Sequence, residues 1–191
     1  LKAPTLKDPL RTDGRFAIVC SRYNAEYTDP MLDAARTVLE AAGASFVEVI
    51  RVPGAFEIPM AASAVARRKR NRVRAILCLG VLWQGETSHA EQIGSAVTRA
   101  LMDISLATGI PCIHEVLTIQ TKKQARQRCI DPRTNRGIEA ARANEVEVFL
   151  PAVIVITGAR TVLGPKDFPG VAANVSQWQE PAPPNFEPSI W

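Results

Sequence analysis

The sequence AILCLGVLWQGETSHAEQIGSAV, residues 75–97, joins an apolar run, a polar turn and a segment with helical spacing. The apolar run 75–79 is typical of a strand buried on both faces of a parallel sheet. The turn that follows ends in Thr87, Ser88 and His89. The first backbone N–H groups of a helix have no partner inside the helix, so a turn at this place can bind an anion. Taken alone, the pattern is more typical of a capped loop with a surface histidine.

The same alternation of apolar runs and helical spacing recurs along the chain, and it predicts four strands with helices between them. The predicted strands are 16–20, 46–50, 75–79 and 112–117. The predicted helices are 28–43 with Pro30 in the first turn, 59–70, 90–109, one that follows a cap at Thr121, and 138–146 after an interruption at Asn135-Arg136-Gly137. Strands that alternate with helices form a parallel sheet covered on both faces. We therefore predict an α/β fold, a three-layer α/β/α sandwich around a central four-stranded parallel sheet.

Unusual polar and aromatic residues follow several of these predicted strands. They are Tyr23-Asn24, 54–57, 81–89 and His114. Ligands of parallel α/β sheets bind beyond the carboxyl ends of the strands, where these segments are expected to meet. The convergence favours a small-molecule site that no single motif would establish.

Composition and charge exclude several classes of protein. Hydrophobic residues make up 47% of the chain and the net charge is +4, which is typical of a globular protein. The basic run 67–74 contains no aromatic residue, so we interpret it as the solvated end of a helix and expect no nucleic-acid partner. The longest apolar stretch, 149–156, is too short to span a bilayer, so no membrane partner is expected.

The four cysteines form no C-x-x-C pair, and the chain has two histidines, so no metal site is predicted. Reduced, buried thiols in a cytoplasmic protein are expected. Residues 1–14 are polar, contain two prolines and are predicted to form an arm. The main domain is predicted over 15–148, followed by an extension rich in proline and glycine over 149–191, in which 149–156 resembles a fifth strand.

Six motifs in a fixed order resemble those of the lumazine synthase (6,7-dimethyl-8-ribityllumazine synthase) family. They are Arg22-Tyr23-Asn24, VPGAFEIP at 52–59, Gly85-Glu86-Thr87-Ser88-His89, Val116-Leu117-Thr118, Gln124-Ala125 followed by Arg128, and Asn135-Arg136-Gly137. The resemblance implies a flavodoxin-like sheet and a transferase of riboflavin biosynthesis that needs no cofactor. The implied reaction joins 5-amino-6-(D-ribitylamino)uracil to 3,4-dihydroxy-2-butanone 4-phosphate through a Schiff base, with loss of phosphate and water and closure of the ring.

The resemblance also implies a role for each candidate site residue. His89 matches the base that transfers protons, for which an ordinary pKa of about 6.5 is suitable. The implied phosphate-binding residues are Glu86, Thr87 and, from a neighbouring subunit, Arg128. The implied contacts to the pyrimidine and its ribityl chain are Tyr23, Asn24, Ala55, Phe56, Glu57, Val81, Leu82, Trp83 and His114.

Several departures from the family pattern leave alternatives open. Gln84 stands where the family usually has Arg or Lys, and His114-Glu115 replaces a usual Phe-Gly at the rim of the pocket. The chain could therefore be a related condensing enzyme with altered substrates, or a non-catalytic shell protein that binds a flavin-type ligand. Structural interpretations also remain for single residues: Phe56 in the core, Arg128 as a solvated helix charge, and Asn24 as the cap of a turn.

The resemblance finally implies a homo-oligomer. Family members form pentamers with sites between neighbouring subunits, and some build shells of about 60 subunits. The short connection between Arg128 and Asn135 slightly favours the larger shell. The early end of the last helix, at 146–151, puts the usual subunit contacts of that helix in doubt.

Overall fold

The computed structural model describes residues 14–143, in which strands and helices alternate as the sequence predicts. The elements are β1 (Arg15–Ser21), α1 (Ala25–Ala41), β2 (Phe46–Val52), the 3-10 turn η1 (Ala55–Glu57), α2 (Ile58–Ala66), β3 (Ala75–Trp83), α3 (His89–Thr108), β4 (Cys112–Ile119), α4 (Lys122–Cys129) and α5 (Arg136–Ala143). The predicted arm up to Asp13, the end of the main domain, the extension 149–191 and its possible strand at 149–156 lie outside the described residues.

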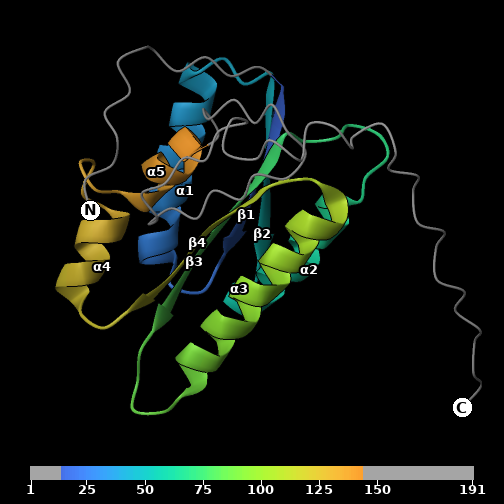
Figure 1. Cartoon of the computed structure of the whole chain (residues 1–191). Coiled ribbons are helices and arrows are strands. Elements are labelled where there is room, and N and C mark those ends of the chain that lie inside the picture. Colours follow the sequence, from blue (N-terminus) through green and yellow to red (C-terminus); the bar gives the residue numbers. More distant parts are fainter. Residues whose placement is uncertain (1–13, 144–191) are drawn as a thin grey trace, which may run out of the picture. The chain divides into compact units, whose positions relative to one another are not determined.

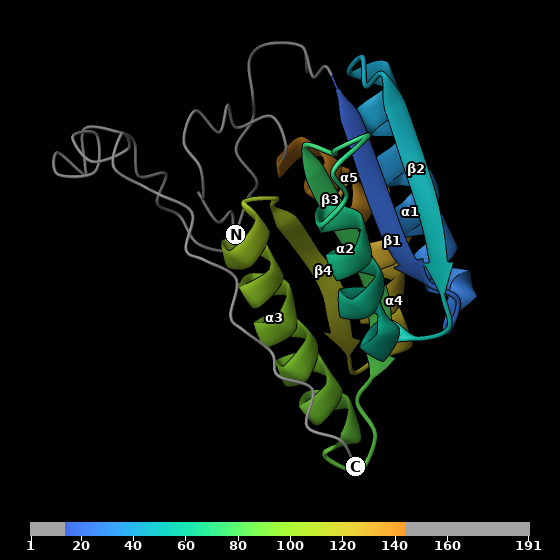
Figure 2. The same ribbon diagram turned by 90° about the vertical axis from the view of Figure 1, so that its right-hand side faces the viewer.

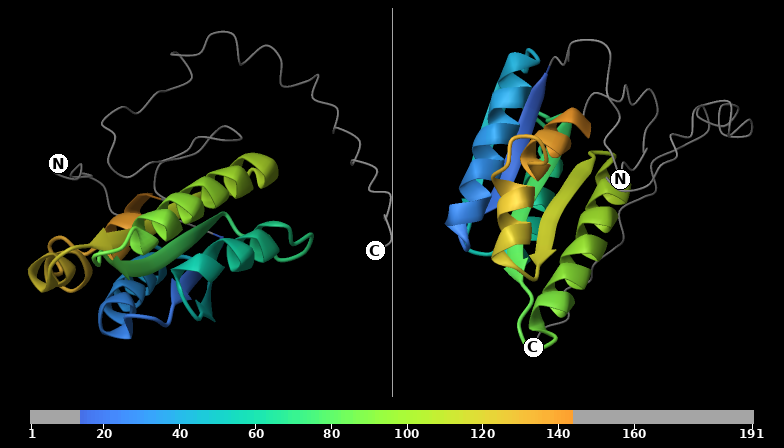
Figure 3. Two further views of the ribbon diagram at one scale, coloured as in Figure 1. Left: turned by 90° about the horizontal axis from the view of Figure 1, so that it is seen from below. Right: turned by 90° about the vertical axis from the view of Figure 1, so that its left-hand side faces the viewer.

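All strand pairs are parallel and the strand order is β2-β1-β3-β4, which is the order of flavodoxin-like sheets. Helices α1, α4 and α5 cover one face, and α2 and α3 cover the other (Figure 1). The right-hand view of Figure 3 shows α1, α5 and α4 side by side across their face. The predicted three-layer α/β/α sandwich with a central four-stranded parallel sheet is confirmed.

The two central strands are apolar throughout because each has a helical layer on both sides. Alternate side chains of a strand point to opposite faces. Ile18 and Leu77 therefore join the core under α1, whereas Ala17 and Ile76 join the core under α2 and α3. None of these four side chains is exposed to solvent. This is the physical reason why short uninterrupted apolar runs predicted a parallel sheet here.

Strand β3 is longer than predicted and continues through Trp83. The prediction placed Gly80 in a turn, which was wrong, because β4 runs alongside and supplies backbone partners as far as the pair Trp83–Ile119. At Gly80 the neighbouring side chains leave little room for a β-carbon. A β-carbon there would lie 3.2 Å from Cδ1 of Ile58 and 3.4 Å from Cβ of Ala55. The loop before α3 is consequently short, 84–88.

Helix α1 begins three residues before the predicted start at Thr28. Asn24 adopts a left-handed conformation with φ of 60°, and its carbonyl oxygen accepts hydrogen bonds from the backbone N–H groups of Tyr27 and Thr28. Pro30 therefore lies inside the helix rather than at its first position. Its ring removes one backbone hydrogen bond of the helix. Burial of neighbouring Met31, which has no exposed surface, stabilises the helix at that point.

The basic run 67–74 follows α2 instead of belonging to it. Helix α2 ends at Ala66, four residues before the predicted end, so these cations are not the last turn of a helix. Arg68 forms an ion pair with Glu48 of β2. Lys69, Arg70 and Arg72 are exposed in the connection to β3.

Helix α5 begins at Arg136, so the motif Asn135-Arg136-Gly137 starts this helix rather than interrupting one. Gly137 packs directly on the backbone of α1. A β-carbon at this position would lie 2.0 Å from the carbonyl oxygen of Met31. The Asn135 side chain receives a hydrogen bond from the N–H of Gly137 and donates one to the carbonyl of Cys129. The motif thus docks α5 onto α1.

Candidate active site

The carboxyl side of the sheet, where all four strands end, carries the loops that follow β1, β2 and β3 (Figure 2). Two hydrogen bonds connect these loops. The backbone N–H of Tyr23 donates to the carbonyl of Pro53 at 2.9 Å, and Nδ2 of Asn24 donates to the carbonyl of Val81 at 2.8 Å. The end of β1 is therefore joined to the ends of β2 and β3.

Two aromatic rings on this side of the sheet are largely exposed. Tyr23, after β1, is 74% exposed and Phe56, in η1, is 63% exposed. The interpretation of Phe56 as a core residue is therefore wrong. Exposed rings held on short loops are suited to offset stacking against a flat heteroaromatic ligand.

Ala55 and Glu57 lie beside Phe56 in η1, but their side chains are turned differently. Ala55 is 5% exposed and packs near Gly80, so only its backbone is available to a ligand. Glu57 is half-buried, and its Oε2 accepts a hydrogen bond from the N–H of Gly54 at 2.8 Å. This bond orients the carboxylate, whose other oxygen can accept from hydroxyl groups.

The last residues of β3 contribute mainly backbone and packing. Val81 is 2% exposed, and its carbonyl accepts the hydrogen bond from Asn24. Asn24 therefore ties two loops together rather than capping its own helix through its side chain. Leu82 packs against the core under α2 and α3. The Trp83 ring meets Tyr27 edge to face at a centroid distance of 5.7 Å, on the other face of the sheet.

The loop 84–88 leads into the exposed N-terminus of α3, where His89 is the first helical residue. Glu86, Thr87 and His89 are all exposed. Gln84 folds across the loop, and its Nε2 lies 3.3 Å from the carbonyl of Gly85. Among the described residues no side chain caps α3, so the positive end of this 20-residue helix faces solvent. An uncapped helix start with a neighbouring imidazole is suited to a phosphate and to proton transfer.

Within one chain His114 lies apart from this group, so its predicted position at the carboxyl ends of the strands is wrong, while its role in substrate binding stays a prediction. It pairs with Cys78 in the first half of β4, well before the strand ends. Its Nε2 lies 3.0 Å from Oγ1 of Thr98 on α3, and burial holds the pKa of His114 below its ordinary value. Glu115 points to the opposite face, is 2% exposed and lies 3.8 Å from Nε of Arg136. Glu115 therefore does not line the rim of a pocket.

Arg128 is half-buried near the end of α4. Helix α4 packs on the face of the sheet opposite α3, so Arg128 and His89 belong to different layers of one chain.

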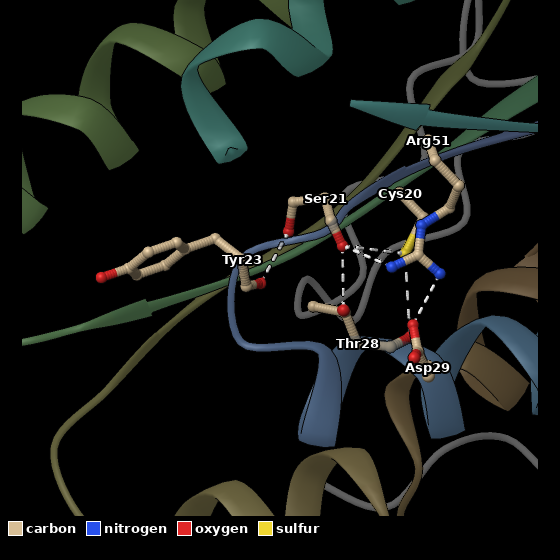
Figure 4. A network of polar contacts seen from close by, with 6 residues as sticks. All are labelled: Cys20, Ser21, Tyr23, Thr28, Asp29 and Arg51. Atoms are coloured by element: carbon tan, nitrogen blue, oxygen red, sulfur yellow. Dashed lines mark hydrogen bonds and ion pairs between the residues drawn. The ribbon is translucent and has the colours of Figure 1, made fainter. Parts of the chain in front are cut away.

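Sequence analysis missed a group of polar contacts at the end of β1, two residues before Tyr23. Arg51 of β2 reaches Ser21 at the end of β1 and Asp29 in α1 (Figure 4). The one available signal was an arginine directly before the VPGAFEIP motif. Its partners are 22 and 30 positions away in the sequence, and only the fold brings them together.

Within residues 14–143, no helix has the length and apolar character needed to cross a membrane. No group of three or more His, Cys, Asp or Glu side chains in this part of the chain is arranged to hold a metal ion. All four cysteines are free thiols.

The fold defines a parallel α/β protein whose loops after β1, β2 and β3 gather beyond the carboxyl ends of its strands. Residues 13–148 match the family described as 6,7-dimethyl-8-ribityllumazine synthase. A protein of that name from Xanthomonas campestris pv. campestris (strain B100) is 38% identical over 134 residues, 69% of this chain and 86% of the relative. A protein with the same name from Kineococcus radiotolerans is 39% identical over 131 residues, which are 68% of this chain and 80% of the relative. The chain belongs to the 6,7-dimethyl-8-ribityllumazine synthase family.

Proposed function

We propose that this chain is a transferase that condenses 5-amino-6-(D-ribitylamino)uracil with 3,4-dihydroxy-2-butanone 4-phosphate, giving 6,7-dimethyl-8-ribityllumazine, phosphate and water. The observation that carries the proposal is the placement of two exposed aromatic residues, Tyr23 and Phe56, after β1 and β2 on the carboxyl side of the sheet, where Asn24 also joins the end of β1 to β3. Membership of the family gives this arrangement its chemistry.

The proposed pyrimidine seat lies between the loops after β1 and β2. The ring of Tyr23 stacks on the pyrimidine, and backbone groups of 81–83 at the end of β3 meet its polar edge. The ribityl chain extends along η1, where the carboxylate of Glu57, oriented by Gly54, accepts from its hydroxyl groups. A ring held in place before the ligand arrives loses little further freedom on binding.

The proposed phosphate seat is the N-terminus of α3. The backbone N–H groups around Glu86 and Thr87 and the positive end of the helix stabilise the phosphate as substrate and as leaving group. His89 transfers the protons that imine formation and phosphate elimination require. Arg128 of a neighbouring subunit binds the same phosphate through its forked donors.

We propose that the functional form is a homo-oligomer, either a pentamer or a shell of about 60 copies. Support comes from the placement of Arg128 and His89 in different layers of one chain. Native mass spectrometry tests this directly, since the mass should be five or sixty times the 20.8 kDa of the chain. A monomer at working concentration would contradict the proposal.

The alternatives of altered substrates or ligand binding without catalysis are not favoured by the family assignment. One reason for suspecting altered substrates has also weakened, because Glu115 is buried against α5 instead of facing the site.

The proposed activity is tested by mixing the purified full chain with the two substrates. The lumazine absorbance and free phosphate should rise together in equal amounts, above the spontaneous reaction measured without protein. Rates equal to that background would refute the activity, and tight binding of the product without turnover would identify the chain as a ligand-binding relative.

A further inference from the structure

The backbone carbonyl of Ser21, the last residue of β1, accepts hydrogen bonds from two neighbouring elements, besides a longer contact of 3.6 Å from the thiol of Cys20. Its oxygen accepts a hydrogen bond from Oγ1 of Thr28 at 2.9 Å and another from Nη2 of Arg51 at 3.1 Å. Nη1 of the same guanidinium donates to Oδ1 of Asp29 at 2.6 Å. One side chain of β2 therefore connects the end of β1 to the beginning of α1 (Figure 4).

Tyr23 lies two residues beyond this carbonyl, and its backbone is fixed on the other side as well. The N–H groups of Arg22 and Tyr23 donate to the carbonyls of Val52 and Pro53 at 2.8 and 2.9 Å. In Figure 4 the Tyr23 ring points away from Arg51 and its partners. The loop thus has an anchored backbone and an aromatic ring directed to solvent.

The charge of Arg51 is what makes this anchor strong. The exposed fraction of its side chain is 22%, against 48% for Asp29, so the ion pair is partly shielded from water. Burial raises the pKa of neighbouring Cys20 to about 11, so its thiol stays protonated at neutral pH and Asp29 is the anion that pairs with Arg51. A guanidinium is well suited to bond the carbonyl and the carboxylate at once, because its donors form a planar fork.

We propose that Arg51 is a positioning residue for pyrimidine binding: it fixes the loop 22–24 so that the Tyr23 ring is held in its stacking position before the substrate arrives. The inference rests on the proposed role of Tyr23. It goes beyond that role, because Arg51 itself contacts no substrate and acts through Ser21 and Asp29. The N-terminus of α3, the proposed phosphate seat, receives no contact from this group in the described part of the chain.

The test is Arg51→Met in the full chain, which keeps the apolar stem and removes the donors. KM for the pyrimidine should rise roughly tenfold, the equivalent of losing about one charged hydrogen bond. KM for the butanone phosphate should stay within about twofold of the parent value. Arg51→Lys, which retains a charge for Asp29 but not the fork, should give a smaller rise for the pyrimidine.

Arg68→Met is the matched control, because it also breaks an arginine–carboxylate ion pair. Its partner, Glu48, lies on β2 like Arg51 but away from the carboxyl end of that strand. Both KM values should then remain those of the parent. Amide hydrogen exchange provides a readout independent of activity. The backbone amides of Arg22 and Tyr23 should exchange faster in Arg51→Met than in the parent, and at the parent rate in Arg68→Met. If Arg51→Met does not fold, Asp29→Asn weakens the same anchor from its exposed partner, and it should shift exchange and the pyrimidine KM in the same direction.

An unchanged pyrimidine KM in a folded variant, or an equal rise in both KM values, would overturn the inference. If the parent itself forms no lumazine, the proposed function fails while exchange still decides the positioning role. Parent-like exchange at Arg22 and Tyr23 in the folded Arg51 or Asp29 variant would then refute it.

Discussion

At the scale of single residues, the site depends on a few side chains whose partners lie far away in the sequence. Asn24 takes the left-handed conformation that ends the β1 loop, and its amide reaches Val81, 57 positions further on. The Tyr23 ring and the His89 imidazole remain exposed while the backbone beside each is held by hydrogen bonds. A preformed binding site requires both features: a backbone that is already ordered and a side chain that is exposed to the ligand.

His89→Ala should lower kcat roughly 10²–10⁴-fold, the range typical of losing a general acid–base group. Affinity for the pyrimidine should change little, because the proposed stacking surface is formed by other loops. Steady-state kinetics with both substrates measure this. Glu91→Gln, at an exposed position in the same first turn, is the control and should keep the parent kcat. Equal kcat in His89→Ala and parent would remove the proposed base.

The half-buried imidazole of His114 should make the protein less stable in mild acid. Burial lowers the pKa of His114 in the folded chain below its ordinary value of about 6.5, so its contribution to stability is present above that pH and is lost as the pH falls below it. Urea unfolding at pH 7 and pH 5 should show this loss, and the loss should be smaller in His114→Gln. The chain has only two histidines, so NMR can follow each ring. A His114 midpoint at or above 6.5 would contradict the prediction.

At the scale of elements, apolar runs predicted the two central strands because helices cover both of their faces, and the edge strands β2 and β4 were predicted from mixed runs of apolar and polar residues. These runs could not predict where β3 ends, since that depends on the backbone partners that β4 offers as far as Ile119. The start of α1 was missed for a similar reason. Pro30 indicated a helix start at Thr28, but the helix begins earlier, directly after Asn24, whose side chain bonds to the distant carbonyl of Val81. The register of β3 and β4 likewise decides that His114 lies away from the carboxyl ends of the strands, and this register cannot be read from the sequence.

Gly137→Ala tests the docking of α5 onto α1. The added methyl would meet the Met31 carbonyl at 2.0 Å, so the helices must separate, and we expect a loss of about 1–3 kcal/mol in the free energy of unfolding. Thermal and urea unfolding measure it.

Gly94→Ala in α3 is the matched control, because its nearest neighbour, Oγ1 of Thr118, would be at 3.4 Å. That variant should be neutral or more stable by up to about 1 kcal/mol, since alanine favours a helix more than glycine does. Equal effects of the two substitutions would show that close packing at Gly137 is unimportant.

At the scale of the whole molecule, the loops after β1, β2 and β3 lie together at the carboxyl ends of the strands. Arg128, however, lies in α4, on the face of the sheet that α3 does not cover. This division is the reason for proposing that neighbouring copies complete each site. The loops after β1, β2 and β3 could be predicted from the sequence to meet, because carboxyl ends of parallel strands lie together. The contribution of a neighbour could be expected only from the family resemblance.

The most direct test of a lumazine-forming site shared between copies is complementation. His89→Ala and Arg128→Ala chains are dissociated, mixed in equal amounts and reassembled, and lumazine formation is measured. About one quarter of the sites should then combine an intact His89 with an intact Arg128 from a neighbour, restoring about a quarter of the parent activity. Mixed assemblies, verified by native mass spectrometry, that are no more active than the mean of the two variants reassembled separately would contradict the account.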